Sequence, residues 1–297
     1  MFTGLSAFPI TPLNQDGVNE AAFTRLVARL AAAGVDSIGA LGSTGVYAYL
    51  DRAERARVAR LAVEHADGVP VMVGIGALRT REVLALAEDA QQAGVSALLL
   101  APVSYHALNA DEVYNLYATV ARNVSVPVCV YDNPGVSRFD FSDELHGRIA
   151  QLKHIASIKI PGVPADPAAA AQRVARLRAL APAHVSIGVS GDKFGAAGLS
   201  AGCALWYSVI GGIFPATTLA ITRAAQAGQA DEAARLSARL QPLWDLFAKY
   251  KGSLRVVAAA AGLMGLAQQP CLPLPLQAID GADREHLASL IDTLALA

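Results

Sequence analysis

Short, almost continuously apolar runs recur along the chain, separated by longer segments in which apolar residues return every three or four positions. Eight of these runs have the length of strands, at 5–8, 37–41, 71–74, 97–100, 126–131, 155–159, 184–189 and 204–208. Such runs are typical of parallel strands that are buried on both faces. The pattern therefore predicts a repeated strand–helix arrangement.

The longer segments have readable helix signals at their ends. The first two segments end at Gly34 and near Gly68, and glycine is typical of the residue that follows a helix. Side chains that can cap a helix N-terminus begin the segments at Asn19, Asp51, Thr80, Asn109 and Asp166, the last followed by Pro167.

Eight strand–helix units in roughly 210 residues predict a TIM (β/α)8 barrel. The alternative is an open, doubly wound sheet, but its Gly-rich dinucleotide turn is missing, since "GIG" at 74–76 is not G-x-G-x-x-G. After Pro215 the chain becomes all-helical. We therefore expect the barrel to span 1–214, with a C-terminal helical extension at 215–297 packed on it.

Composition narrows the class of protein. The chain has 297 residues, 54% of them hydrophobic, and a net charge of −1 without a basic run, which argues against nucleic-acid binding. No apolar stretch reaches the roughly 18 residues of a membrane span, and no leader precedes the first strand, so we expect a cytoplasmic protein. The three cysteines lie far apart and the six histidines form no metal-binding pair, so we expect no metal.

One predicted strand carries a lysine where an aliphatic residue is expected, Lys159 in "HIASIKIPG". The ordinary explanation is a side chain that runs along apolar surface and reaches water with its ammonium. The alternative is an amine that loses its proton in a dry pocket and attacks a carbonyl. In a barrel, chemistry lies where the strands end, and Lys159 stands near such an end.

Other strand ends bring hydroxyl groups to the same rim. "GSTG" (42–45) follows the second strand and "YDNPG" (131–135) the fifth. Each has a structural explanation: the first is a tight turn before a helix, and Tyr131 is an amphipathic core residue. Their convergence favours the catalytic interpretation of Lys159.

With these motifs, the chain resembles the dihydrodipicolinate synthase / N-acetylneuraminate lyase family of pyruvate-dependent class I aldolases. The resemblance extends from "AFPITPLNQDGVNEAAF" through "LGSTG", "YDNP" and "SIKIPG". It implies that Lys159 forms a Schiff base with pyruvate or another 2-oxo acid. Tyr131 would transfer protons and Thr44 would relay them, while Ser43, Thr44 and Gly45 would hold the substrate carboxylate. No metal or organic cofactor is implied, and the expected assembly is a homo-oligomer, a dimer or tetramer.

The chain also departs from dihydrodipicolinate synthases. Val46 stands where those enzymes usually have a glutamate, and Val136 where they have a substrate-binding arginine. Arg138, two residues further on, is a weak substitute. The family often adds a tyrosine from a neighbouring subunit, for which Tyr105 is a weak candidate and Ser104 the simpler alignment.

Four further positions differ from the family. Leu78 and Val103 make the lysine-inhibition site of some synthases incomplete, so feedback inhibition by lysine is not expected. On the last strand, Trp206 and Tyr207 stand where the family usually has small aliphatic residues. We expect Trp206 to pack in the barrel wall and Tyr207 to contribute to substrate binding.

Three functions follow from these residues. The first is a Schiff-base-forming lyase or aldolase that joins a 2-oxo acid to an aldehyde or cleaves a sugar acid. The second is 4-hydroxy-tetrahydrodipicolinate synthase, which condenses pyruvate with aspartate semialdehyde. The third is a non-catalytic barrel that binds oxo acids.

Overall fold

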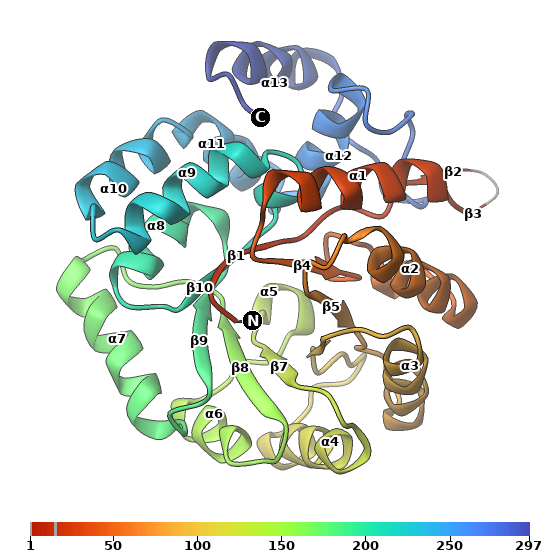
Figure 1. Ribbon diagram of the computed structural model, residues 1–297, viewed down its shortest axis with the longest axis vertical. Coiled ribbons are helices and arrows are strands. Elements are labelled where there is room, and N and C mark those ends of the chain that lie inside the picture. Colours follow the sequence, from red (N-terminus) through yellow and green to blue (C-terminus); the bar gives the residue numbers. More distant parts are fainter. Residues whose placement is uncertain (1, 15–16) are drawn as a thin grey trace.

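Eight parallel strands close into a barrel surrounded by helices (Figure 1). The computed structural model describes residues 2–14 and 17–297. Residues 15 and 16, which belong to the sequence motif at 7–23, lie outside these ranges. The strands are β1 (Gly4–Ala7), β4 (Ser37–Ala40), β5 (Val71–Gly74), β6 (Ala97–Leu100), β7 (Val128–Tyr131), β8 (Ile155–Ile160), β9 (Ser186–Val189) and β10 (Leu205–Ser208). Closure of β1 on both β4 and β10 confirms the predicted TIM barrel and excludes the open sheet.

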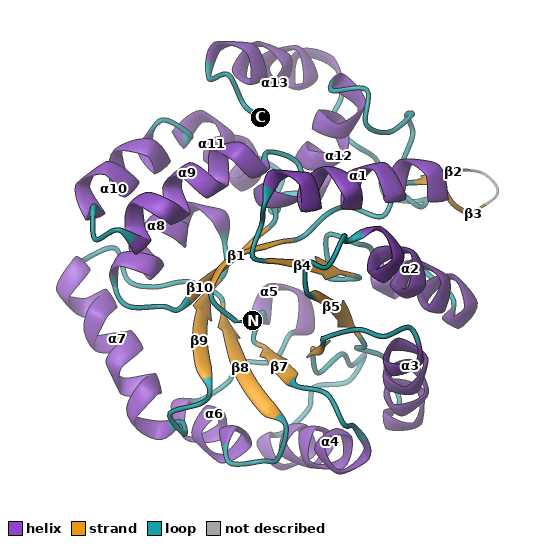
Figure 2. Cartoon of the chain, in the orientation of Figure 1, coloured by secondary structure: helices purple, strands orange, loops and turns teal. Residues whose placement is uncertain are grey.

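A ring of helices covers the outside of the barrel (Figure 2). Its members are α1 (Glu20–Ala33), α2 (Arg52–His65), α3 (Thr80–Gln92), α4 (Ala110–Asn123), α6 (Asp143–Ala150), α7 (Pro167–Leu180), α8 (Gly195–Ser200) and α9 (Pro215–Gln226). Shorter elements lie between strands and helices: β2 (Leu13–Asn14), β3 (Gly17–Val18), α5 (Pro134–Ser137) and the single turns η1 (Tyr47–Tyr49), η2 (Asp192–Phe194) and η3 (Ile210–Gly212).

The cap residues act largely as predicted. Asn19 and Asp166 accept from backbone amides of α1 and α7, and Asp51 and Asn109 form complete capping boxes. Two helix ends differ from the prediction. Thr80 is the first residue inside α3 rather than its cap, and α2 ends at His65, before Ala66 and the left-handed Asp67 that precede Gly68.

The C-terminal part is helical, as the pattern predicts. It continues from α9 with α10 (Ala230–Ala238), α11 (Gln241–Lys249), α12 (Leu254–Leu263) and α13 (Gly281–Thr293). Figure 1 shows α9 in the ring of helices and α13 outside it. One hydrophobic cluster contains residues from both parts of the chain, so the division at residue 214 stays a prediction.

Two hydrophobic clusters divide the core according to the alternation of side chains along the strands. On β6, Leu98 and Leu100 belong to the larger cluster between strands and helices, whereas Ala97 and Leu99 belong to a smaller one inside the barrel. The inner cluster also contains Phe8, Tyr131 and Tyr207. Trp206 faces the other way, against Gly195 of α8, which confirms its place in the barrel wall. The inner cluster forms the floor of the site described next.

Candidate active site

Lys159 lies inside the barrel near the carboxyl end of β8. Its residue is paired in register with Tyr131 of β7, and only 4% of its surface is exposed. Nζ lies 4.0 Å from the centre of the Phe8 ring and 4.4 Å from that of Tyr131. Within the described part of the chain, no carboxylate pairs with this nitrogen and no atom accepts a hydrogen bond from it. Lys159 therefore does not snorkel to water, which contradicts its ordinary explanation.

The Tyr131 hydroxyl joins the lysine to two other segments of the rim. It lies 2.8 Å from the Ser43 hydroxyl and accepts a hydrogen bond of 2.8 Å from Nδ2 of Asn133. Because the Asn133 amide donates, the tyrosine proton is free to be donated to Ser43. Ser43, Tyr131 and Asn133 thus form a short chain of hydrogen bonds beside Lys159.

The turn that carries Ser43 is strained. Leu41 and Val46, on either side of "GSTG", have φ angles of 55° and 49°, values that a branched residue such as Val46 rarely adopts. A Cβ on Gly45 would lie 2.9 Å from the Leu41 amide nitrogen, so the turn closes only with glycine there. This geometry turns Ser43, and not Thr44, toward Tyr131.

Thr44 and its neighbours offer unused donors. The Thr44 side chain is buried, and its hydroxyl has no hydrogen-bond partner among residues 2–14 and 17–297. In the same described ranges, the amides of Ser43, Thr44 and Gly45 donate to no acceptor. Successive free amides at a turn attract anions such as a carboxylate.

Tyr207 lies below Lys159 with its hydroxyl turned away from it. Nζ is 5.3 Å from the Tyr207 ring centre, while the hydroxyl lies 2.6 Å from Oγ of Ser157 and 3.2 Å from Sγ of Cys129. Burial raises the pKa of Tyr207 well above its ordinary range and that of Cys129 to about 11. Tyr207 therefore offers the site its ring, and a role in substrate binding stays a prediction.

The structure does not bring the weaker candidates to the lysine. Tyr105 is 83% exposed, and its ring lies 5.2 Å from that of His106, centre to centre. Ser104 is half-buried, and Arg138 is exposed at the C-cap of α5. None of the three side chains forms a hydrogen bond or ion pair in the part of the chain that the structure describes.

Sequence reasoning missed two neighbours of Tyr131. Asn133 stands before a proline and has the signal of a turn residue, yet its side chain caps no helix and bonds the tyrosine instead. Asp132 faces outward, 3.4 Å from Nε2 of His146 on α6, and its amide donates to the Lys159 carbonyl. That bond holds the ends of β7 and β8 together.

Asp192 anchors another part of the rim. Its carboxylate accepts from the Ser208 hydroxyl and from the amides of Val209 and Ile210, which ties η2 to the end of β10. Burial raises the pKa of Asp192 to about 6, against these hydrogen bonds and the positive charge of Lys159, which lower it.

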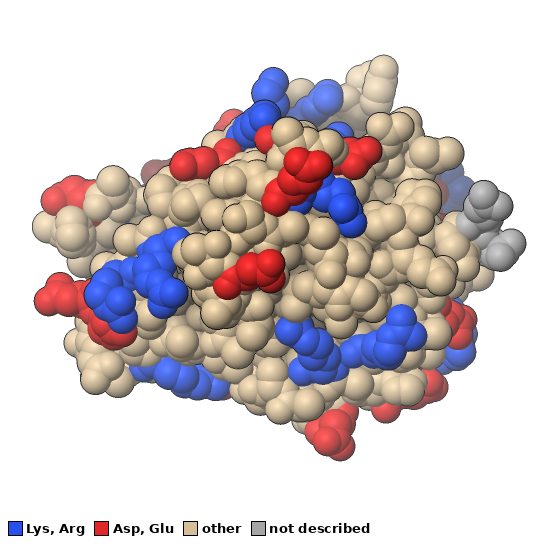
Figure 3. Space-filling model, turned by 90° about the horizontal axis from the view of Figure 1, so that it is seen from above, with Lys and Arg blue, Asp and Glu red and all other residues tan. Residues whose placement is uncertain are grey.

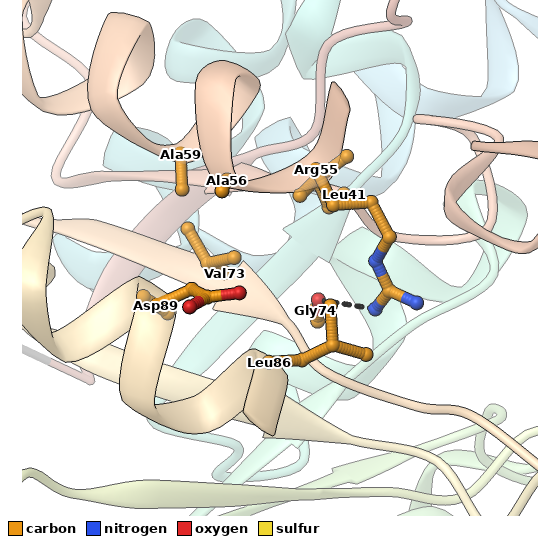
Figure 4. Close-up of a pocket in the computed structure, with 9 residues that line it drawn as sticks. Leu41, Arg55, Ala56, Ala59, Val73, Gly74, Leu86 and Asp89 are labelled. Atoms are coloured by element: carbon orange, nitrogen blue, oxygen red, sulfur yellow. Dashed lines mark hydrogen bonds between the residues drawn. The ribbon is translucent and has the colours of Figure 1, made fainter. Parts of the chain in front are cut away.

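A cavity between α2, α3 and β5 is not a second active site (Figure 4). Its volume of about 10 Å³ is enough for about one water molecule. Arg55 lines it and donates to the carbonyls of Gly74 and Gly76, while Asp89 lies on the opposite side. Burial lowers the pKa of Arg55 to about 10, and its bonds fix the turn after β5.

Comparison with known proteins agrees with this geometry. A profile of the dihydrodipicolinate synthetase family matches residues 1–294. The chain belongs to this family. It is 34% identical over 280 residues to a 4-hydroxy-tetrahydrodipicolinate synthase from Methylococcus capsulatus, covering 93% of this chain and 92% of the relative.

Solved structures of the family superpose closely on the chain. A dihydrodipicolinate synthase from Agrobacterium tumefaciens has a TM-score of 0.94 and 47% identity, with 99% of this chain and 98% of the other covered. A prophage protein of the dihydrodipicolinic acid synthase family from E. coli K12, solved with pyruvate, has a TM-score of 0.89 and 25% identity over the whole of both chains.

Membership of the dihydrodipicolinate synthetase family makes the chain a lyase of the class I aldolase type. Enzymes of this family work through a Schiff base between a lysine and pyruvate and need no separate cofactor. No helix in the described residues is long and apolar enough to cross a membrane. On the face shown in Figure 3, basic and acidic side chains are interspersed, without a broad basic patch.

Proposed function

We propose that Lys159 forms an imine with pyruvate or a closely related 2-oxo acid, and that the resulting enamine adds to an aldehyde or arises from cleavage of a sugar acid. The observation that carries the proposal is the position of Nζ, buried among aromatic rings, one of which belongs to a tyrosine whose hydroxyl has two hydrogen-bond partners. A buried amine without an ion-pair partner is suited to nucleophilic attack.

The steps follow from the contacts. The neutral Lys159 amine attacks C2 of the oxo acid, and the carbinolamine loses water to give an iminium. Loss of a C3 proton then gives the enamine, whose C3 attacks the aldehyde carbon. Tyr131 is the group placed to give and take these protons, with Ser43 as its relay partner. We therefore propose Ser43, rather than Thr44, as the relay.

The free amides of the "GSTG" turn support a carboxylate site. Ser43, Thr44 and Gly45 offer three N–H groups, and the Thr44 hydroxyl adds a fourth donor. A 2-oxo acid bound there through its carboxylate would be held at the end of β4, across the rim from β8.

A panel of 2-oxo acids, incubated with the protein and borohydride, tests the proposal by mass spectrometry. Pyruvate or a close analogue should add its reduced mass to the peptide that contains Lys159, and Lys159→Ala should abolish the label. Absence of labelling by every acid of the panel would refute the proposal.

A second candidate, 4-hydroxy-tetrahydrodipicolinate synthase itself, is favoured by the names of the curated relatives. Against it stands Val136, 55% exposed in place of the expected arginine, with Arg138 also directed to solvent. Expression in a diaminopimelate auxotroph separates the two: growth supports the synthase, and failure of a well-expressed protein favours another acceptor.

We further propose a cytoplasmic homo-oligomer. Exposed apolar side chains follow three neighbouring strands of the rim, namely Tyr49 after β4, Leu78 after β5 and Tyr105 after β6. Large apolar residues gathered at one edge are typical of an interface between subunits. Sedimentation velocity of the full chain tests this: a single monomeric species at micromolar concentration would contradict it.

A further inference from the structure

Three aromatic rings surround Nζ of Lys159, those of Phe8, Tyr131 and Tyr207, and we call them the aromatic box. The nitrogen lies over each ring, at 4.0, 4.4 and 5.3 Å from their centres. Distances within about 6 Å of a ring face allow an attractive cation–π interaction, which is stronger where water is absent. The box thus offers π faces to a positive charge at this atom.

The Phe8 ring is seated by two glycines of the neighbouring segment. A Cβ on Gly39 of β4 would lie 2.4 Å from Cζ of Phe8, and a Cβ on Gly42 would lie 2.7 Å from Cδ1. Neither distance is tolerated between carbon atoms. The ring therefore fills a slot that exists only because these positions lack side chains.

The Tyr207 ring is fixed in a similar way. A Cβ on Gly188 of β9 would lie 2.4 Å from Cε2 of Tyr207, and Ser157 and Cys129 hold the tyrosine hydroxyl from below. The Phe8 and Tyr207 rings pack edge to face, with centres 6.1 Å apart. Both rings are thus held in place independently of the lysine.

We propose that Phe8 and Tyr207 act in catalysis by stabilising, through the faces of their rings, the positive charge of the iminium at Lys159. The inference rests on the proposed function, since it requires an imine at this residue. Tyr131 adds a third face, but its hydroxyl has a separate role.

The charge balance of imine formation gives this proposal a signature. When the neutral amine reacts, one ketone and one proton are consumed, water leaves, and a positive charge appears at Nζ. When the ammonium reacts, water leaves and the charge at Nζ is conserved. The rings therefore favour imine formation from the amine, whereas from the ammonium their contribution nearly cancels.

Other titrating groups near Lys159 do not produce the same signature. Those that face it are Tyr131 and Cys129 from β7, Tyr207 from β10 and Asp192 from η2. Burial raises the pKa of Tyr207 well above its ordinary range and that of Cys129 to about 11, and Asp192, with a pKa of about 6, is ionised at alkaline pH. These groups and Tyr131 are the same in every variant of a series altered only at Phe8.

Graded fluorination of one ring tests the proposal in the full-length protein. Phe8→4-fluorophenylalanine, Phe8→3,5-difluorophenylalanine and Phe8→pentafluorophenylalanine progressively weaken the negative ring face with little change in shape. The readout is the pyruvate concentration that gives half-maximal borohydride trapping, measured on the acid side and on the alkaline side of the ordinary lysine pKa. We expect that concentration to rise stepwise, by up to about tenfold, on the alkaline side, with little change on the acid side.

Controls separate a charge effect from a packing effect. Fluorination of Phe23, a buried ring of α1, should leave trapping unchanged at both pH values. Tyr207→Phe keeps the ring face, so in this background fluorination of Phe8 should still act on the alkaline side and not on the acid side. A rise of equal size at both pH values, or no trend with fluorine number, would overturn the proposal. If pentafluorination prevents folding, the mono- and difluorinated proteins still define the trend. Loss of trapping in the unaltered protein would instead refute the proposed function.

Discussion

The rim of the barrel has two unlike sides. On one, Ser43, Tyr131 and Lys159 are held by hydrogen bonds, ring faces and strand pairing within the chain. On the other, the side chains of Tyr105 and Arg138 project into solvent, without hydrogen bonds or ion pairs among the residues described.

This difference separates two halves of the proposed reaction. The interior side contains what is needed to activate a 2-oxo acid: a nucleophile, a proton-transfer group and free amides for a carboxylate. The exposed side is the one open to the second substrate or a neighbouring subunit, and no side-chain hydrogen bond or ion pair among the described residues fixes Tyr105 or Arg138 there. The donor is therefore better determined by the structure than the acceptor.

The largest effect is expected from removing one oxygen on the interior side. Tyr131→Phe keeps the ring beside Lys159 but leaves Ser43 and Asn133 without their shared partner. Because the group that transfers protons is lost, turnover should slow by about 10²-fold or more. Steady-state kinetics with the best donor measures this. A rate close to that of the unaltered enzyme would remove Tyr131 from the mechanism.

The sequence predicted much of this interior side. Each barrel strand lies within two residues of its predicted range, because strands buried on both faces leave nearly continuous apolar runs. Lys159 stood out as a charge in such a run. Which hydroxyl of "GSTG" meets Tyr131 could not be predicted, since the choice depends on the left-handed backbone of Leu41 and Val46. The Asn133 bond likewise depends on how α5 follows β7.

The adjacent hydroxyls of the turn should behave differently. Ser43→Ala removes the partner of Tyr131 and should lower the maximal rate by about tenfold, the scale of one hydrogen bond. Thr44→Ala should instead raise the half-saturating pyruvate concentration by a similar factor, with a smaller change in maximal rate. Rate and saturation measured side by side check this, and the reverse pattern would return the relay to Thr44.

A pH effect on stability is expected at Asp192, with the sign set by burial. Its pKa of about 6 lies above the unfolded value of 3.8, so the folded state binds more protons between these values. Stability should therefore decrease as pH rises through this window, relative to Asp192→Asn, by on the order of 1–3 kcal/mol. Urea unfolding of both proteins from pH 4 to 7 measures it; a constant difference would contradict the assignment.

The smallest effect on folding is expected from the exposed side. Tyr105→Ala removes an 83% exposed ring that packs against His106 and should change the free energy of unfolding by no more than about 0.5 kcal/mol. It should nevertheless weaken self-association, measured by sedimentation. A large loss of stability at concentrations where the chain is monomeric would show that the two sides are not as different as described.

The most direct test of the account is exchange of the C3 protons of pyruvate with deuterated water, followed by NMR in the absence of any aldehyde. Because Lys159 and Tyr131 need no acceptor to form the enamine, the enzyme should catalyse this exchange by itself. Lys159→Ala should reduce it to the uncatalysed rate. Exchange that persists in Lys159→Ala, or that is absent from the unaltered enzyme, would contradict the claim that this side of the rim activates the donor.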